Sequence, residues 1–303
     1  MRRVPGDVDW SFGGTWPHEP RWLDTDGVRI HYVATGAPGG EPVVLFHGNP
    51  TWSYTYRHLI AALGDAGFRA VAWDQLGFGR SDKPARIDAY GVPRSVDHAG
   101  RLIDELALDG VTLVGHDWGA MIALAWAVQH PERVRRLVLL NSFTGSHPPW
   151  RMPLQLRLLA APGLGAVMTR GLRATVRFFL FRGGMLHPER LGRNERAAYL
   201  APHPSWGSRA GLRAAVRMLP WNEHSTTPAV GREIDAGLAR LADKPTLVVW
   251  GAGDRVVHRG WLEHYRRSLP LAEVHELEDA GHFVQEDAPE RLGPLVADFL
   301  RRT

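Results

Sequence analysis

The pentapeptide GHDWG, residues 115–119, is the segment whose residue types point most directly to chemistry. An apolar run, residues 111–114, precedes it, and a longer apolar run, residues 120–127, follows it. This pattern predicts a buried strand, a tight turn flanked by glycines and then a helix. The same arrangement carries the G-x-S-x-G motif, in which the turn exposes the middle residue as a nucleophile. In this chain the middle residue is Asp117, which we predict to be the nucleophile.

An aspartate at this turn changes the reaction that the site can complete. A serine that attacks a saturated carbon forms an ether, which leaves the enzyme alkylated after one turnover. A carboxylate that attacks a saturated carbon forms an alkyl ester, and water can hydrolyse that ester in a second step. The start of the following helix supplies free N–H groups and a partial positive charge, which help to keep the carboxylate ionised. Asp117 therefore predicts displacement at a carbon–halogen bond or at the C–O bond of an epoxide.

Two partners for Asp117 each follow a predicted strand. Asp254 lies in a turn after residues 246–250, and His282 follows residues 273–277. The order nucleophile, acid, histidine is that of the α/β-hydrolase triad. We expect His282 to take a proton from the hydrolytic water, and Asp254 to orient the imidazole and stabilise its charged form.

The turn His47-Gly48-Asn49-Pro50 comes directly after another predicted strand, residues 42–46. Its backbone N–H at Asn49 can face the backbone N–H of Trp118, and the two form an oxyanion hole for the tetrahedral intermediate of ester hydrolysis. The Asn49 amide and the Trp118 indole add two N–H donors at the same place. A halide ion accepts hydrogen bonds and donates none, so we predict Asn49 and Trp118 as the halide-binding pair.

Other polar residues near these motifs have structural interpretations. We expect His47 and His116 to hold the geometry of their turns, and Asp74 to fix the loop in which it lies. The competing position for the triad acid follows residues 137–140, but that position holds Asn141.

The spacing of apolar runs predicts the elements that position these residues. Strands are expected at residues 28–33, 42–46, 69–73, 111–114, 137–140, 246–250 and 273–277, and helices at 59–63, 95–108 and 290–300. Several strands are apolar on both faces and alternate with helices. This predicts an α/β fold with a mostly parallel sheet that is covered by helices on both faces.

One stretch breaks the alternation of strands and helices. Residues 145–231 show only helix-like patterns interrupted by proline and glycine. We predict a helical cap domain at 145–231, over the carboxyl edge of a core formed by residues 1–144 and 232–303. Ligands bind at that edge in such folds.

Composition narrows the class of protein. The 303 residues contain no cysteine, which excludes disulfides and thiolate metal sites. No apolar run is long enough to span a membrane, and the first ten residues lack the apolar segment of a secretory signal. We therefore expect a cytoplasmic protein that has no membrane partner.

The basic charge of the chain comes almost entirely from arginine side chains. The formal net charge is only +4, and all the basic residues except Lys83 and Lys244 are arginines. The arginines of the expected cap stand singly among apolar residues, as on the solvated faces of amphipathic helices. We predict no nucleic-acid partner; a gel-shift assay at physiological salt should show no complex, and a complex that weakened steeply with added salt would contradict this.

The chain resembles the haloalkane dehalogenases, a capped branch of the α/β-hydrolase superfamily. The resemblance is carried by residues 47–50, 74–84, 115–119, 250–254 and 281–287, and the cap matches only loosely. It implies Asp117 as nucleophile, His282 as base and Asp254 as acid, with Asn49 and Trp118 binding halide. It also implies a covalent alkyl–Asp117 ester, a small apolar halogenated substrate, and neither a metal nor an organic cofactor.

Four other functions share parts of this pattern. Epoxide hydrolases also carry GHDWG, but they use two cap tyrosines, and residues 151–231 contain only Tyr199. Fluoroacetate dehalogenases carry arginine after the nucleophile, where this chain has Trp118. A cofactor-free oxygenase and a catalytically idle small-molecule receptor use the same scaffold, and the motif alone leaves both open.

Apolar residues of the cap are candidates for lining the substrate site. They are Trp150, Phe178, Phe179, Leu180 and Trp206, each of which could equally belong to the core of the cap. The sequence leaves open the size of the substrate, a second halide-binding tryptophan in the cap, and self-association of the protein through the cap as a homo-oligomer.

Overall fold

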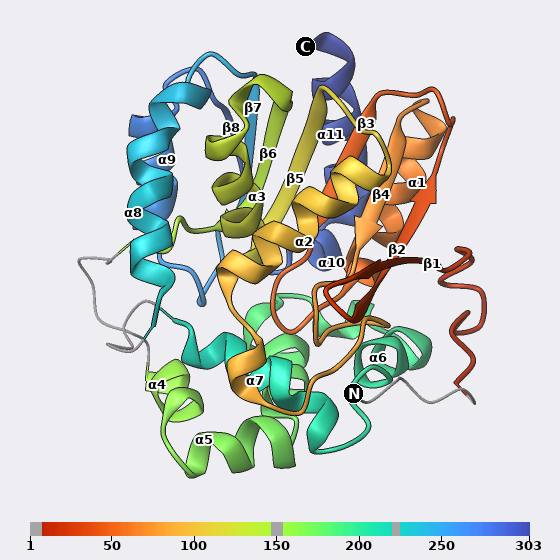
Figure 1. Cartoon of the computed structure of the whole chain (residues 1–303), viewed down its shortest axis with the longest axis vertical. Coiled ribbons are helices and arrows are strands. Elements are labelled where there is room, and N and C mark those ends of the chain that lie inside the picture. The colour runs from red at the N-terminus through yellow and green to blue at the C-terminus, as the bar shows by residue number, and fades with distance from the viewer. Residues whose placement is uncertain (1–7, 147–153, 220–224) are drawn as a thin grey trace.

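The computed structural model describes residues 8–146, 154–219 and 225–303, which are built around one eight-stranded sheet (Figure 1). The strand order is β1-β2-β4-β3-β5-β6-β7-β8. The pairs β1–β2 and β2–β4 are antiparallel, and all the other neighbours are parallel. The strands are β1 (Arg21–Thr25), β2 (Val28–Thr35), β3 (Pro42–Phe46), β4 (Arg69–Trp73), β5 (Val111–Asp117), β6 (Val134–Ser142), β7 (Thr246–Gly251) and β8 (Glu273–Leu277).

All seven strands expected from the sequence are present, and β3, β4 and β8 have the expected bounds. The antiparallel edge strand β1 was not expected. Its five residues include only two buried ones, Leu23 and Thr25, so it lacks the apolar run that marks the central strands. A mostly parallel sheet with helices on both faces confirms the predicted fold class.

Alternate residues of the central strands face opposite sides of the sheet and belong to two separate hydrophobic cores. In β3, Val44 and Phe46 belong to one core, and Val43 and Leu45 to the other. This period of two follows from the pleat of the strand. Because both faces are buried, the strand has no polar positions, which explains its continuous apolar run.

Helices cover both faces of the sheet (Figure 1). On one face α3 packs against both α2 and α8, and on the other α1 packs against α11. The core helices are α1 (Arg57–Asp65), α2 (Val92–Glu105), α3 (Trp118–Gln129), α8 (Thr227–Gly237), α9 (Gly260–Ser268), α10 (Val284–Asp287) and α11 (Pro289–Arg302), with short 3-10 turns at Ser53–Tyr56, Ile87–Ala89, Pro131–Arg133 and Leu238–Leu241. The predicted boundary between cap and core at residue 231 falls inside α8, which lies against α3.

The described part of the expected cap contains helices and no strand, and it lies beyond one edge of the sheet (Figure 1). Its elements are α4 (Leu154–Ala160), α5 (Leu164–Ala166), α6 (Arg193–Leu200) and α7 (Ala210–Arg217), the π-helical segments Val167–Gly171 and Thr175–Gly184, and the 3-10 turns Pro188–Arg190 and Gly207–Arg209. The domain bounds 145–231 stay a prediction. Among the described residues, no helix is long and apolar enough to cross a membrane.

A buried ion pair fastens α6 of the cap to the core. Arg57 of α1 donates two hydrogen bonds to Glu286 of α10, at 2.6 and 2.8 Å, and the Tyr199 hydroxyl of α6 also donates to Glu286. The Arg57 and Glu286 side chains are only 8% and 1% exposed. A charge at such a depth is tolerated only with its partner in place.

We expect Glu286→Gln to lower the free energy of unfolding by about 3 kcal/mol, because it leaves the Arg57 charge buried without its carboxylate. Urea unfolding followed by circular dichroism measures the loss. The matched control is Glu290→Gln, which breaks the exposed ion pair between Arg190 and Glu290 and should cost at most about 1 kcal/mol. Equal losses in the two variants would contradict this role of the buried pair.

Candidate active site

Asp117 is the last residue of β5, and it lies in a strained backbone conformation. Its φ of 54° and ψ of −125° are sparsely populated for a residue with a side chain. The flanking glycines permit the turn: a Cβ at Gly115 would lie 2.4 Å from Ala120, and one at Gly119 would lie 2.0 Å from the Phe46 carbonyl oxygen. Gly48 is also required, because a Cβ there would lie 2.5 Å from the Cβ of Asp117. The strand, turn and helix expected around GHDWG are therefore confirmed.

The structure brings Asp117, His282 and Asp254 together, although they come from three separate parts of the chain. Nε2 of His282 lies 3.5 Å from Oδ2 of Asp117, and Nδ1 of His282 lies 3.0 Å from Oδ2 of Asp254. All three side chains are at least nine-tenths buried. This is the geometry of a nucleophile, a base and an orienting acid.

Asn141 supports Asp254 from the end of β6. Its amide Nδ2 donates to Oδ2 of Asp254 at 2.8 Å, and its Oδ1 accepts the backbone N–H of Gly251. The other carboxylate oxygen of Asp254 accepts the backbone N–H groups of Val256 and Val257. Asn141, at the competing acid position, therefore holds Asp254, the acid proposed from the sequence. The sequence alone did not reveal this support.

Asp287 holds the turn that carries His282 against the cap. Its carboxylate accepts the backbone N–H of Gly281, at 2.8 Å, and those of Leu186 and His187, at 3.0 and 2.8 Å. The backbone N–H of His282 donates to the carbonyl of Gly184 at 2.7 Å. The position of the histidine is thus coupled to the cap segment 184–187.

The electrostatics of the triad favour an ion pair in the free enzyme. Burial alone would lower the pKa of His282, but the nearby carboxylates of Asp254 and Asp117 outweigh it and raise that pKa. Burial would raise the pKa of Asp117, but the hydrogen bond and charge of His282 and the backbone N–H of Trp118 lower it instead. Burial and the charge of His282 lower the pKa of the neighbouring His116 to about 3, so its ring stays neutral at physiological pH.

We expect Asp254→Asn to lower kcat on the order of a thousandfold, because the imidazolium of His282 loses the carboxylate that stabilises it. Since Asp254 raises the pKa of His282, its removal lowers that pKa. His282 must be neutral to accept a proton, so the acidic limb of the kcat profile should move to lower pH. Halide release measured from pH 5 to pH 10 tests both effects. An unchanged kcat, or an acidic limb shifted to higher pH, would contradict this role of Asp254.

The turn at residues 47–50 places its backbone at the nucleophile. The N–H of Asn49 donates to Oδ1 of Asp117 at 2.9 Å, and the N–H of Trp118 also bonds to the Asp117 carboxylate. His47 fixes this turn, with Nδ1 hydrogen-bonded to the Gly48 carbonyl and Nε2 accepting the N–H of Gln75. His116 bonds through Nε2 to the carbonyl of His282. The structural role expected for His47 is confirmed, whereas His116 is bonded to the turn that carries His282 and not to its own turn.

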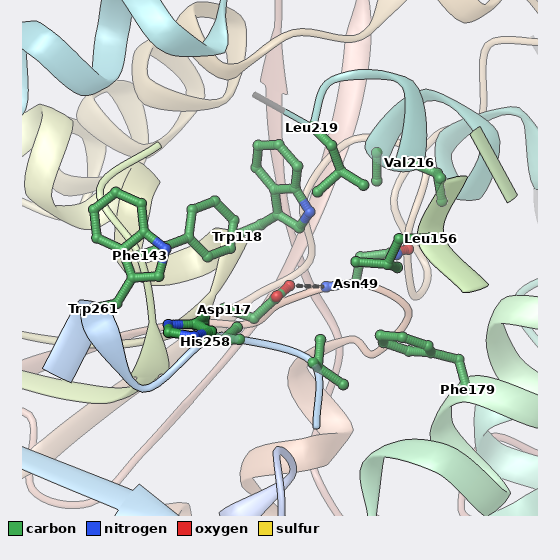
Figure 2. Close-up of a pocket in the computed structure, with 13 residues that line it drawn as sticks. Asn49, Asp117, Trp118, Phe143, Leu156, Phe179, Val216, Leu219, His258 and Trp261 are labelled. Carbon is green, nitrogen blue, oxygen red and sulfur yellow. Dashed lines mark hydrogen bonds between the residues drawn. The ribbon is translucent and has the colours of Figure 1, made fainter. Parts of the chain in front are cut away.

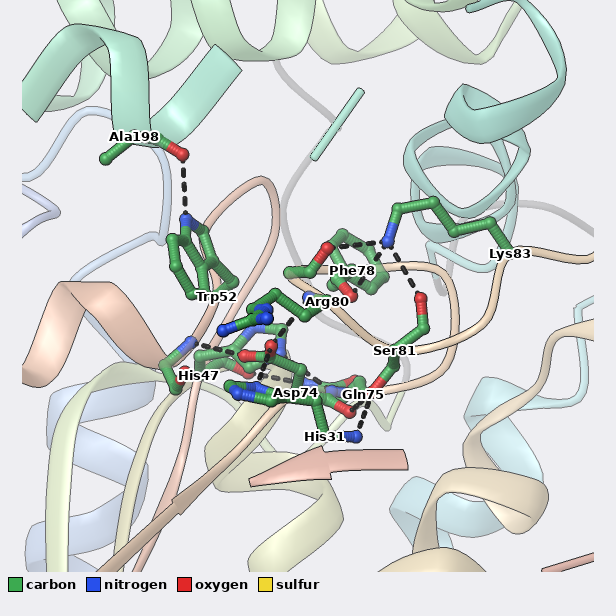
Figure 3. Close-up of polar contacts among 12 residues, drawn as sticks. His31, His47, Trp52, Asp74, Gln75, Phe78, Arg80, Ser81, Lys83 and Ala198 are labelled. Carbon is green, nitrogen blue, oxygen red and sulfur yellow. Dashed lines mark hydrogen bonds and ion pairs between the residues drawn. The ribbon is translucent and has the colours of Figure 1, made fainter. Parts of the chain in front are cut away.

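A buried network holds the neighbouring loop, residues 74–83 (Figure 3). Asp74 accepts hydrogen bonds from His31 and from the backbone N–H groups of Ser53 and Arg80, as expected for a residue that fixes its loop. Lys83 donates to three backbone carbonyls of the same loop. Burial lowers the pKa of Lys83 to about 7 despite the nearby Asp74.

An apolar cavity lies over Asp117 (Figure 2). Asn49, Trp118 and Asp117 line it together, and the Trp118 indole nitrogen and the Asp117 carboxylate face the same space. Its other lining residues are Phe143, Leu156, Phe179, Ala215, Val216, Leu219, Val256, Val257, His258 and Trp261. Few polar groups in a mostly apolar cavity are typical of a small-molecule site.

Of the cap residues expected at the substrate site, only Phe179 lines this cavity. Leu180 is fully buried elsewhere, whereas Phe178 and Trp206 are about half exposed, at 52% and 48%. Trp150 lies outside the described residues. Phe143, His258 and Trp261 were not singled out from the sequence. Phe143 directly follows β6, so its position after a predicted strand was an available signal. His258 and Trp261 lie seven and ten residues beyond the end of β7, and no such signal marks them.

Comparison with known proteins agrees with this site. The family model described as "alpha/beta hydrolase fold" matches residues 41–289. A haloalkane dehalogenase of Mycolicibacterium paratuberculosis is 36% identical over 91% of this chain and 87% of the relative. The crystal structure of haloalkane dehalogenase DatA from Agrobacterium tumefaciens superposes with a TM-score of 0.84 and 28% identity, over 94% of this chain and 96% of that one. A cis-3-alkyl-4-alkyloxetan-2-one decarboxylase of Shewanella oneidensis is 36% identical over 95% of this chain and 90% of the relative.

The chain therefore belongs to the α/β hydrolase family, in the branch that includes the haloalkane dehalogenases. This confirms the resemblance that the sequence motifs indicated.

Proposed function

We propose that the protein is a hydrolytic dehalogenase that converts haloalkanes to an alcohol, a halide ion and a proton. The observation that carries the proposal is an aspartate at the nucleophile turn, buried beneath an apolar cavity and beside two N–H donors, the Asn49 amide and the Trp118 indole. Haloalkane dehalogenases among the relatives support the same reaction. Exclusion of water from the cavity strengthens both the nucleophile and the contacts to the departing halide.

The first step is displacement at the carbon that bears the halogen. Oδ1 of Asp117 is held by the N–H of Asn49, so Oδ2 is the oxygen that attacks. The new C–O bond forms as the carbon–halogen bond breaks, and the halide leaves with the bonding electron pair. The Trp118 indole N–H and the Asn49 amide N–H bind that halide. The product of this step is an alkyl ester on Asp117.

The second step is hydrolysis of the ester. Alkylation removes the negative charge of Asp117, which is one of the causes that raise the pKa of His282. The pKa of His282 therefore falls when a base is needed. Nε2 of His282 takes a proton from water, and the hydroxide attacks Cγ of Asp117. The N–H groups of Asn49 and Trp118 stabilise the oxyanion. Its collapse expels the alkoxide, which takes the proton back from His282 and leaves as the alcohol. The carboxyl group of Asp117 then releases its proton, which is the proton product of the reaction, and is a carboxylate again.

Decarboxylation of a cis-3-alkyl-4-alkyloxetan-2-one is the second candidate, because two of the relatives carry that name at 36% and 34% identity. Asp117 can serve this reaction as well. Its carboxylate attacks the alkyl-bearing ring carbon that is bonded to the ring oxygen, and the lactone opens to a free carboxylate. Loss of CO2 then forms the C=C bond and expels Asp117. No water enters, so His282 has no role as a base towards water.

An epoxide hydrolase is disfavoured by the position of Tyr199. Its hydroxyl donates to Glu286 and its side chain is fully buried between cap and core. None of the residues that line the described cavity is a tyrosine. The acid that would protonate an epoxide oxygen is therefore not supplied by this side chain.

The experiment that tests the proposal is halide and acid release from 1,2-dibromoethane and 1-iodobutane. We expect release of halide and acid, and we expect oxygen from isotopically labelled water to be recovered in the Asp117 carboxylate. Styrene oxide and a cis-dialkyl oxetan-2-one are assayed in parallel. Absence of halide release from both haloalkanes would refute the proposal. Alkene and CO2 formed from the lactone would then indicate a decarboxylase, and diol formed from styrene oxide would indicate an epoxide hydrolase. A ligand that binds and is recovered unchanged would indicate a receptor.

A further inference from the structure

A second apolar cavity lies in the cap beside the active-site cavity. Two residues, Phe179 and Val256, line both cavities and therefore form the partition between them. Helix α4 also lines both cavities, with Leu156 at the first cavity and Leu159 at the second. The remaining lining residues of the second cavity are Gln155, Leu158, Met168, Ala174, Phe178, Gly183 and Arg255.

Phe179 is placed to control passage between the cavities. Its ring comes from the π-helical segment Thr175–Gly184 and is directed towards the space over Asp117 (Figure 2). It lies edge-on to His282 and Phe283, with ring centroids 6.3 and 6.4 Å apart. The ring is only partly buried, and the cavities on both sides of it leave space for its rotation about χ1. π-helical segments occur often at functional sites.

The chemistry of the second cavity fits an alkyl chain. Leu159 and Ala174 are buried in its wall, whereas Leu158 and Phe178 are 41% and 52% exposed at its outer end. The cavity thus offers an apolar path from the surface of the cap to the partition at Phe179. Its polar groups, Gln155 and Arg255, lie in the lining without any hydrogen bond to Asp117, Asn49 or Trp118.

We propose that the second cavity is a subsite for the alkyl chain of the substrate, with Phe179 as the residue that determines chain length. This inference rests on the proposed displacement at Asp117. The reacting carbon lies at Asp117, and the chain passes Phe179 and Val256 to be buried against Leu159 and Ala174. The substrate class is then long-chain alkyl compounds, and each further methylene that is buried should raise kcat/KM by about fourfold.

The test compares kcat/KM for 1-bromobutane and 1-bromooctane, measured as bromide release. In the natural protein we expect the octyl substrate to be favoured by at least about tenfold. Ala174→Leu fills the second cavity from its buried wall, and Leu158→Glu places a charge at its outer end. Each variant should lower the octyl-to-butyl ratio about tenfold. The ratio does not depend on the fraction of active protein, so partial misfolding of a variant does not obscure the result.

The matched control is Leu164→Glu, which makes the same change at a cap residue that is 54% exposed and lines neither cavity. It should keep the natural ratio. An octyl-to-butyl ratio near one in the natural protein, or an unchanged ratio in Ala174→Leu, would overturn the subsite. Absence of bromide release from both substrates would instead count against the proposed function; calorimetric binding of 1-octanol and 1-butanol to the natural protein and to Ala174→Leu then decides the subsite without turnover.

Discussion

Replacement of Asp117 by alanine should reduce halide release from 1,2-dibromoethane at least about ten-thousandfold, to the rate without enzyme. Water in the cavity cannot replace the carboxylate, because Asp117 alone carries the nucleophilic oxygen while the neighbouring Asn49 and Trp118 offer only hydrogen-bond donors. The strained φ of 54° at this position is also a poor fit for alanine. Stability should therefore not increase despite the removal of a buried charge.

The control for this variant is Asp109→Ala, which removes an exposed carboxylate from the turn between α2 and β5. It should release halide at the natural rate. Ion chromatography of the released halide, together with circular dichroism to verify folding, gives the comparison. Turnover by folded Asp117→Ala within a factor of about ten of the natural protein would exclude Asp117 as the nucleophile.

Replacement of His282 by glutamine should separate the two chemical steps. Displacement of halide needs only Asp117 and the halide donors, so we expect a burst of one halide ion per protein molecule. Hydrolysis of the ester needs the base, so steady turnover should fall about ten-thousandfold. Glutamine retains a hydrogen-bond donor for the nearby carboxylates, which limits the structural change.

Rapid mixing with halide detection measures the burst and the steady state in one experiment. Asp254→Asn is the informative comparison, because it weakens the base without removing it and should leave a slow steady state. Steady turnover by His282→Gln at the natural rate would contradict the assigned base. Loss of the burst would indicate that His282 is needed for displacement itself.

The central strands and the triad were predictable because their signals are local. A strand that is buried on both faces, such as β5 or β7, has to be largely apolar. Each proposed catalytic residue lies at or shortly after the carboxyl end of a strand. Asp117, Asp254 and His282 could therefore be placed at one edge of the sheet before the structure was known. Strand β1 escaped prediction because it is the outermost strand of the sheet and only two of its five residues are buried.

The supports of the site could not be predicted, since they depend on tertiary contacts. Nothing in the sequence near Asn141 indicates that its amide bonds to Asp254, more than one hundred residues away. The same holds for Asp287, which links the His282 turn to the cap. In the cap, Phe178 and Phe179 are adjacent aromatic residues, and only the packing of their π-helical segment determines which ring faces Asp117.

The measurement that tests the account most directly is the mass of His282→Gln after incubation with 1-bromobutane. The account predicts a mass increase of one butyl group, located by fragmentation on Asp117, and no such increase in the double variant that also carries Asp117→Ala. A protein that releases bromide while its mass stays unchanged would contradict the covalent ester and, with it, the proposed mechanism.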